Sequence, residues 1–331
     1  MLQVLRKIAF PISLIYALVV YVRNFLFDLG VFKSKSFSTP TICIGNISVG
    51  GTGKTPMTEF ILKLLNDKKV AVLSRGYKRQ SKGFVLANEN SSVLELGDEP
   101  FQIHKKFPNV TIAVDGDRRN GMANLEQKVQ PDVIVLDDAM QHRWVKPTIT
   151  ILLTAYSKLY VNDWYLPTGD LRDAKMASKR ADVIVVTKCP TSISEEEKKS
   201  MTLKLKPEPH QKVLFASLVY ADFVSNGNQQ KPLSELKNKP FALVTGIASP
   251  KPLVHYLKSL GLEFEHFEFG DHHHFTDNEI GQFSGFGKIL TTEKDFVRLD
   301  GRVNDLYYLE VAHQFNAVDK MVMEETLRQL F

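Results

Sequence analysis

One glycine-rich segment, SVGGTGKT at residues 48–55, limits the folds available to this chain more than any other feature. It lies between an apolar run of strand type, TICIGN (41–46), and an amphipathic run of helix type, PMTEFILKLLND (56–67). Its end matches the Walker A pattern GxxxxGK[ST], although Ser48 takes the place of the first glycine. Small residues before a helix let successive backbone N–H groups point at phosphates. The segment therefore predicts a P-loop.

The chemistry of phosphate binding assigns roles within this loop. Lys54 is expected to neutralise the β- and γ-phosphate oxygens, and the Thr55 hydroxyl to ligate Mg²⁺. An ordinary glycine-rich turn is the alternative interpretation of this segment. It is disfavoured because a strand precedes the segment, a helix follows it, and Lys54 stands at the lysine position of the Walker A pattern. The residues expected to bind the nucleotide are Ser48, Val49, Gly50, Gly51, Thr52, Gly53, Lys54 and Thr55.

Five further apolar runs follow the loop, with helix-like stretches between them: 70–75, 110–114, 132–138, 149–154 and 182–188. They are continuously apolar instead of alternating, as strands covered on both faces are. The fold expected is α/β, a P-loop NTPase-like doubly wound and mostly parallel sheet.

The composition changes after Cys189-Pro190, because the segment 207–240 is polar and contains four prolines. We interpret it as the exit from a P-loop domain at 37–220. Strand-like and helix-like runs resume at 241–247, 250–261, 263–269 and 288–295, which predicts a smaller α/β domain at 221–331.

The N-terminal segment, residues 1–36, is both basic and apolar. It carries five basic residues and one acidic residue, so it supplies +4 of the net charge of +5. Ile8–Val22 has no charge, but its fifteen residues fall short of the ~20 that span a bilayer. An interfacial helix on a membrane, a buried first helix and a transmembrane anchor stay open, and the basic flanks favour the first. Such local charge does not indicate nucleic-acid binding.

Polar residues gather where the predicted strands end. Asp137 and Asp138 end the run 132–138, at the sheet edge where ligands bind in such folds, and one of them is expected on the metal. Other candidates are individually weak: Asp98 could be a helix N-cap, and Arg172 with Asp173 a surface ion pair. Further polar residues expected at this edge are Arg75, Arg118, Gln141 and His142.

The run Asp271-His272-His273-His274-Phe275 permits three interpretations: proton transfer by a histidine that a carboxylate orients, a metal site, or surface residues. Consecutive side chains diverge, and no second ligand cluster completes a metal shell. The two cysteines, Cys43 and Cys189, lack metal-site spacing and are expected in the core. Guanine-specific P-loop proteins usually contact the base through an [NT]KxD motif. The comparable segment here, Thr187–Pro190, has no aspartate, so ATP is favoured over GTP.

Taken together, these segments resemble the lipid A 4′-kinases (tetraacyldisaccharide 4′-kinases). The matching stretches occur in the family's order: GNISVGGTGKTP (45–56), LSRGY (73–77), LGDEP (96–100), DR (117–118), LDDAMQH (136–142), LPTGDLRD (166–173), VVTK (185–188), DHHHF (271–275) and TTEKD (291–295). Two departures are Asp173, where the family usually has glutamate, and Ala139-Met140, where it commonly has Gly-Phe.

The resemblance implies transfer of the ATP γ-phosphate to the 4′-hydroxyl of an acylated glucosamine disaccharide 1-phosphate. It implies that Asp98 acts as a base with His272, or else with His273, and that Asp137 and Asp138 hold Mg²⁺. Cofactor contacts are expected from Lys54 and from Arg75, Arg118, Gln141, His142, Arg172 and Asp173.

The resemblance also implies a place at the cytoplasmic face of the bacterial inner membrane, peripheral or singly anchored. No nucleic acid or protein partner is expected. Two other functions stay open: a P-loop kinase of a soluble small molecule, and a regulatory NTPase of the metallochaperone type. Neither explains the apolar N-terminus, and the second usually has a guanine-reading motif and a metal-ligand cluster.

Overall fold

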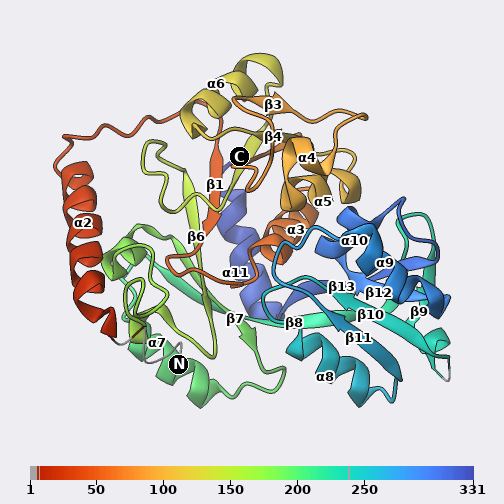
Figure 1. The fold of residues 1–331 in the computed structure, drawn as a ribbon. Helices are drawn as coiled ribbons and strands as arrows, with labels where there is room; N and C mark the ends of the chain where they lie inside the picture. Colours follow the sequence, from red (N-terminus) through yellow and green to blue (C-terminus); the bar gives the residue numbers. More distant parts are fainter. Residues whose placement is uncertain (1–5, 7, 238) are drawn as a thin grey trace.

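A computed structural model of the chain describes residue 6, residues 8–237 and residues 239–331 (Figure 1). Across these residues one sheet runs through the molecule in the strand order β11-β10-β12-β13-β8-β7-β6-β1-β5-β2-β4-β3, with β9 paired to β8. Lys7, one of the basic residues before the apolar run, lies outside the described residues.

The first block of the sheet is parallel, as predicted. It contains β1 (Thr41–Gly45), β2 (Val70–Ser74), β4 (Thr111–Val114), β5 (Val133–Asp137), β6 (Ile149–Ala155) and β7 (Val183–Cys189). The two-residue β3 (Val85–Leu86) pairs antiparallel at the edge. The helices of the first block are α3 (Lys54–Leu64), α4 (Val93–Leu96), α5 (Asp98–Lys106), α6 (Arg118–Lys128) and α7 (Glu195–Leu205), and its 3₁₀ turns are η1 (Tyr160–Asn162) and η2 (Lys175–Arg180).

Burial on both faces explains why these strands do not alternate. Ile42 packs in a cluster with α3 and the C-terminal helix, whereas the next residue, Cys43, packs in the opposite cluster with Met122 of α6. Side chains that follow one another in a strand thus enter two different cores. Cys43 and Cys189 are both buried and free, as expected.

The second block is parallel within itself and antiparallel to the first. It contains β10 (Phe241–Thr245), β11 (Phe264–Glu268), β12 (Ile289–Thr292) and β13 (Leu306–Phe315). The other elements are β9 (Gln230–Pro232), α8 (Lys251–Ser259), α9 (Asp277–Phe283), α10 (Glu293–Leu299), α11 (Ala317–Arg328), and the 3₁₀ turns η3 (Leu233–Leu236) and η4 (Ser284–Phe286).

A single long strand, β8 (Lys212–Ser225), joins the two blocks. Its residues 212–217 pair parallel with β7, and its residues 216–225 pair antiparallel with β13. β8 runs in the direction of the first block, continues past the end of β7, and there pairs with strands that run in the opposite direction. The carboxyl ends of the strands in the two blocks therefore point toward each other. The segment 207–240, interpreted as the exit from the P-loop domain, thus contains a strand that the sequence did not predict. The predicted boundary between residues 220 and 221 falls inside β8.

Helix α2 (Phe10–Asp28) lies along one side of the first block, away from β10–β12 (Figure 1). Among the described residues it is the helix whose length and composition would allow it to cross a membrane. Ser13, Val20, Asn24 and Phe27 are buried, while most of its apolar side chains are exposed. This exposure contradicts the alternative of a buried first helix.

Candidate active site

The glycine-rich loop joins β1 to α3, as the sequence predicts. Gly50 and Gly53 have φ of +104° and +86°, a backbone conformation that glycine adopts without the steric cost of a Cβ. Gly53 is the N-cap of α3, and no side chain caps this end of the helix. The free N–H groups of the first turn, at the positive end of the helix, are therefore available to phosphate oxygens.

Three side chains from outside residues 48–55 hold the loop in this shape. Asn46 Nδ2 donates to Thr52 Oγ1 (2.8 Å), and the Thr187 hydroxyl donates to the Thr52 carbonyl (2.8 Å). His313 Nε2 donates to the Gly53 carbonyl over 2.9 Å. Sequence reasoning missed all three. Asn46 stands beside the motif and could have been found, but Thr187 and His313 come from β7 and β13 and are brought in only by the sheet.

The two carboxylates at the end of β5 have different surroundings. Asp137 accepts a hydrogen bond from the Ser74 hydroxyl (3.1 Å). Its burial, reinforced by the charges of Glu99 and Asp138, raises the pKa of Asp137 to about 6. Asp138 Oδ2 lies 3.9 Å from the Nζ atom of Lys54. The structure thus brings the predicted carboxylate pair to the P-loop lysine.

Arg172 connects this carboxylate pair to the loop. Its Nη1 donates to Asp138 Oδ2 (3.0 Å), and its Nη2 donates to Asn46 Oδ1. Gln141 Nε2 donates to the Asn46 carbonyl over 2.9 Å. Arg172 and Gln141 therefore both lie beside Asn46, which precedes the loop, and their contact with the cofactor stays a prediction.

Asp173 does not join this group. Its side chain is fully buried, accepts from Asn24 Nδ2 of α2 (2.7 Å) and pairs with Arg180 Nη2 (3.1 Å). The suggested surface ion pair between Arg172 and Asp173 does not form. The placement supports a structural role that fastens α2, and not the predicted contact with the cofactor.

Two arginines and a histidine complete the edge of the first block. Arg118 is buried, and its Nη2 donates to the Asp137 carbonyl (3.3 Å). Arg75 is exposed. Burial, together with the positive charges of Arg118 and Arg75, lowers the pKa of His142 to about 4. His142 is therefore neutral at pH 7 and can accept or donate a hydrogen bond there.

The donor set suits a nucleotide with a magnesium ion better than a metal held by protein alone. In the described part of the chain, no three His, Cys, Asp or Glu side chains gather to form a metal site, so the histidine run does not form one. Mg²⁺ is usually held by one or two carboxylates together with substrate phosphates. Thr55, Asp137 and Asp138 provide such a partial set beside the loop.

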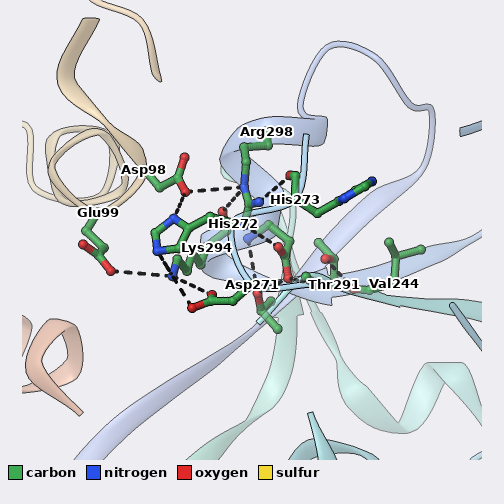
Figure 2. Close-up of polar contacts among 12 residues, drawn as sticks. Asp98, Glu99, Val244, Asp271, His272, His273, Thr291, Lys294 and Arg298 are labelled. Atoms are coloured by element: carbon green, nitrogen blue, oxygen red, sulfur yellow. Dashed lines mark hydrogen bonds and ion pairs between the residues drawn. The ribbon is translucent and has the colours of Figure 1, made fainter. Parts of the chain in front are cut away.

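A second group of polar residues lies between the elements of the first block and those of the second block, which are called here the two halves of the chain (Figure 2). Asp98 is the first residue of α5, and His272 lies in the loop after β11. His272 Nδ1 and Asp98 Oδ2 are 2.6 Å apart. Gly97 and not Asp98 is the N-cap of α5, so the capping interpretation of Asp98 is wrong. His272 has a φ of +57°, which is uncommon for a residue with a Cβ.

The neighbouring histidine points elsewhere. His273 Nε2 lies 3.0 Å from both Glu279 carboxylate oxygens, and its ring stacks on Phe269 at a centroid distance of 4.9 Å. Of the two candidates that the sequence leaves open, the structure brings His272 to Asp98 and keeps His273 within its own half.

Two cations on α10 complete this second group, and sequence reasoning did not select them. Arg298 Nε lies 3.7 Å from Asp98 Oδ2, and Lys294 Nζ lies 2.9 Å from His272 Nε2. Burial alone would raise the pKa of Asp98, but the His272 hydrogen bond and the Arg298 charge hold it below its usual value. The stretch TTEKD contains Lys294, so a signal was present, although it gave no role.

Comparison with known proteins adds an independent finding. A family model described as tetraacyldisaccharide-1-P 4′-kinase (LpxK) matches residues 5–331. A curated tetraacyldisaccharide 4′-kinase from Flavobacterium johnsoniae is 48% identical over 321 residues, which cover 95% of this chain and 94% of the relative. One from Bacteroides thetaiotaomicron is 46% identical over 316 residues, covering 89% and 83%.

Among solved structures, the crystal structure of LpxK from Aquifex aeolicus in complex with ATP is similar with a TM-score of 0.81. The two chains are 29% identical, and the similarity covers 99% of each. Motifs, fold and relatives agree along almost the whole sequence. The chain belongs to the tetraacyldisaccharide-1-P 4′-kinase family.

Proposed function

We propose that Asp98 is the base of the reaction and that His272 is its partner. As a member of its family the chain is an ATP-dependent kinase of lipid A biosynthesis, which transfers the γ-phosphate of ATP to the 4′-hydroxyl of a tetraacyldisaccharide 1-phosphate. The observation that carries the proposal is the 2.6 Å contact between Asp98 and His272. Glu99, the next residue, lies close enough to Asp137 to raise its pKa, which relates this pair to the P-loop side of the site.

The donor side works mainly by neutralising charge. Phosphoryl transfer passes through a loose transition state and depends on positioning and electrostatics more than on covalent chemistry. Lys54, the N-terminus of α3 and an arginine such as the exposed Arg75 provide positive charge around the phosphates. Thr55 and Asp137 would hold Mg²⁺, which supplies further neutralisation, while Asp138 is shared with Arg172 and Lys54.

The acceptor side requires a group that removes the proton from a hydroxyl. Asp98 is ionised at neutral pH, since its pKa lies below the usual value despite its burial. A carboxylate within hydrogen-bond reach of the acceptor can take the proton as the oxygen attacks phosphorus. Placing Asp98 on the first half and His272 on the second makes the pair depend on contact between both halves.

The alternative functions are not favoured. A kinase of a soluble small molecule, or a metallochaperone-type NTPase, would not match this family along residues 5–331.

We propose further that α2 lies in the surface of a membrane, at the cytoplasmic face of the inner membrane where ATP is available. The exposed apolar side chains of α2 include Ile15, Leu18 and Val19, each more than half exposed. Its other side makes polar contacts with the protein, such as Tyr16 to the Arg172 carbonyl. A helix that is apolar outward and polar toward its own domain suits an interfacial position better than a spanning one.

The test of the base is a kinase assay with [γ-³²P]ATP and a tetraacyldisaccharide 1-phosphate in detergent micelles. Asp98→Asn is expected to lower kcat by roughly 10²–10⁴-fold, the contribution typical of a general base. The dissociation constant for ATP, measured by calorimetry, should stay unchanged. Asp67→Asn serves as the matched control, because Asp67 is an exposed aspartate paired with its neighbour Lys68.

The two parts of the proposal fail in different ways. Absence of lipid phosphorylation by the wild-type protein would overturn the activity as a whole. Wild-type turnover in Asp98→Asn would leave the kinase assignment intact and remove Asp98 as the base.

A further inference from the structure

The imidazole of His272 has a partner on each of its two nitrogens (Figure 2). Nδ1 lies 2.6 Å from Asp98 Oδ2, and Nε2 lies 2.9 Å from Lys294 Nζ. The two partners come from α5 and α10, so they hold the ring from opposite sides. The ring also packs edge-on against Tyr77, at a centroid distance of 5.2 Å.

These partners decide which nitrogen carries the proton. A lysine ammonium only donates hydrogen bonds, and a carboxylate only accepts them. Nε2 is therefore the acceptor and Nδ1–H the donor, which defines one tautomer of a neutral ring.

Lys294 is itself held in place. Its ammonium donates to Asp271 Oδ1 (3.1 Å) and lies 3.6 Å from Glu99 Oε1. It projects from the first turn of α10, directly after β12. The His272 backbone N–H is bound to the Gly246 carbonyl (3.1 Å). Ring and lysine thus both have fixed supports on the second half of the chain.

The arrangement leaves one oxygen open for the acceptor. Asp98 Oδ2 faces His272 Nδ1 and the Arg298 guanidinium. Oδ1 makes no hydrogen bond to any described residue. His272 cannot take a proton from the substrate while both of its nitrogens are engaged, so Asp98 Oδ1 is the place for that proton.

We propose that Lys294 is a positioning residue that fixes the tautomer of His272 and thereby makes Asp98 the proton acceptor. This inference rests on the proposed role of Asp98. In the step, the O–H bond of the 4′-hydroxyl breaks and its proton moves to Asp98 Oδ1. The hydroxyl oxygen bonds to the γ-phosphorus, and the bond to the leaving ADP oxygen breaks. His272 and Lys294 exchange no proton.

The direct test is ¹⁵N NMR of the full-length protein labelled at histidine, with His272 assigned from the signal missing in His272→Gln. The wild type is expected to show hydrogen on Nδ1 and a bare Nε2. Lys294→Met, which removes the donor but keeps the length of the side chain, should allow hydrogen on Nε2 as well, because no ammonium faces that nitrogen any longer. Lys294→Arg keeps a donor and should retain the wild-type pattern.

Turnover supplies a second readout. Lys294→Met is expected to lower kcat by about 10–100-fold, as the loss of an orienting partner does, with an unchanged KM for ATP.

Lys251→Met, which changes an exposed lysine on α8, is the matched control and should alter neither readout. Hydrogen on Nε2 in the wild type overturns the proposal, and so does wild-type kcat in Lys294→Met. The wild-type spectrum can still overturn the proposal if Lys294→Met does not fold, and Lys294→Arg then supplies the comparison for kcat. If Asp98→Asn were fully active, the proposed base would fail whatever the tautomer. If Asp98→Asn is inactive and Lys294→Met is normal, only the role of Lys294 fails.

Discussion

Gly53 fits against His313 so closely that no side chain can be added to it. A Cβ at this position would lie 2.8 Å from His313 Nε2, and the φ of +86° strains any residue other than glycine. We therefore expect Gly53→Ala to destabilise the fold by about 1–3 kcal/mol, the usual cost of a strained backbone, and to weaken ATP binding. Urea unfolding and calorimetry measure the two effects.

Gly51→Ala is the control within the same loop. The nearest atom to its added Cβ would be 3.9 Å away, an ordinary contact, and its φ is not positive. The unfolding free energy of Gly51→Ala should match that of the wild type. Equal stability of the two variants would contradict the argument from Gly53.

His142 gives a second prediction at this scale, on pH. Its pKa is lowered to about 4 in the folded protein, whereas an unfolded chain has the ordinary value of 6.5. Between these pH values the unfolded chain binds a proton that the folded protein does not, so stability falls as the pH falls from 6.5 toward 4. His142→Asn cannot titrate and should show a shallower decline in urea unfolding over this range.

The exposed His255 on α8 supplies the comparison. His255→Asn should keep the wild-type slope. If His142→Asn kept the wild-type slope, titration of His142 would not cause the loss of stability, and the lowered pKa would be wrong.

The site residues that the sequence predicted are those whose neighbours in the sequence reveal them. Lys54 and Thr55 stand in a loop whose spacing is itself informative, and Asp137 ends an apolar strand. His313 lacks such a setting, because its partner Gly53 is 260 residues away. Asp98 was found through the family resemblance, since its own surroundings equally suggested a helix cap.

At the scale of elements, the ammonium of Lys106 joins four of them. Lys106 on α5 pairs with Glu59 of α3 (2.7 Å), Glu293 of α10 (2.6 Å) and Glu310 of β13 (3.0 Å). The four side chains are at most 19% exposed. Burial and repulsion from Glu59 raise the pKa of Glu293. One cation thus holds together carboxylates from both halves of the chain.

We expect Lys106→Met to cost about 3–5 kcal/mol of stability, because it leaves buried carboxylates without their cation. Lys105→Met is the adjacent control, where an exposed lysine makes no ion pair among the described residues, and it should change stability by no more than about 0.5 kcal/mol. Urea unfolding compares the two variants. Similar values would mean that the network contributes little.

Elements of the first block were predictable because each strand is apolar on both faces. The polar run 194–200 gave no such signal, yet it forms the start of α7 with a capping box between Ser194 and Glu197. β8 was hidden by the prolines and polar residues around it. β13 was not predicted either, since its sequence LYYLEVAHQF mixes charged and apolar residues.

At the scale of the whole molecule, β8 decides how the two halves are related. The sequence predicted two domains and placed their boundary at 220/221, inside β8. Met323 and Leu327 of α11 return from the C-terminal end to the core of the first block. Sequence patterns show which segments form elements, but a strand shared by two blocks depends on pairings that no local pattern records. The division into two domains stays a prediction.

The proposed membrane position of α2 gives a prediction at this scale. Ile15 and Leu18 are 65% and 62% exposed, and each would lose contact with lipid on change to glutamate. Since burying such a side chain is worth about 1.5–3 kcal/mol, we expect the double variant Ile15→Glu/Leu18→Glu to bind anionic vesicles more than about tenfold more weakly in sedimentation assays.

Leu203→Glu is the control, since Leu203 is 76% exposed on α7, a different helix. It should bind vesicles as the wild type does. A wild-type partition coefficient for the double variant would exclude α2 as the membrane contact.

The attachment of α2 to residues of the candidate active site has a kinetic consequence. Ser13 shares a hydrogen bond with Thr168, and Tyr16 binds the carbonyl of Arg172, whose guanidinium holds Asp138. If α2 lies in the lipid surface as proposed, the proposed catalytic groups stay at one height above it and meet acceptors that diffuse laterally. The reaction rate should then follow the mole fraction of acceptor in the lipid surface. Adding inert lipid to a fixed amount of acceptor lowers this mole fraction and should slow the reaction.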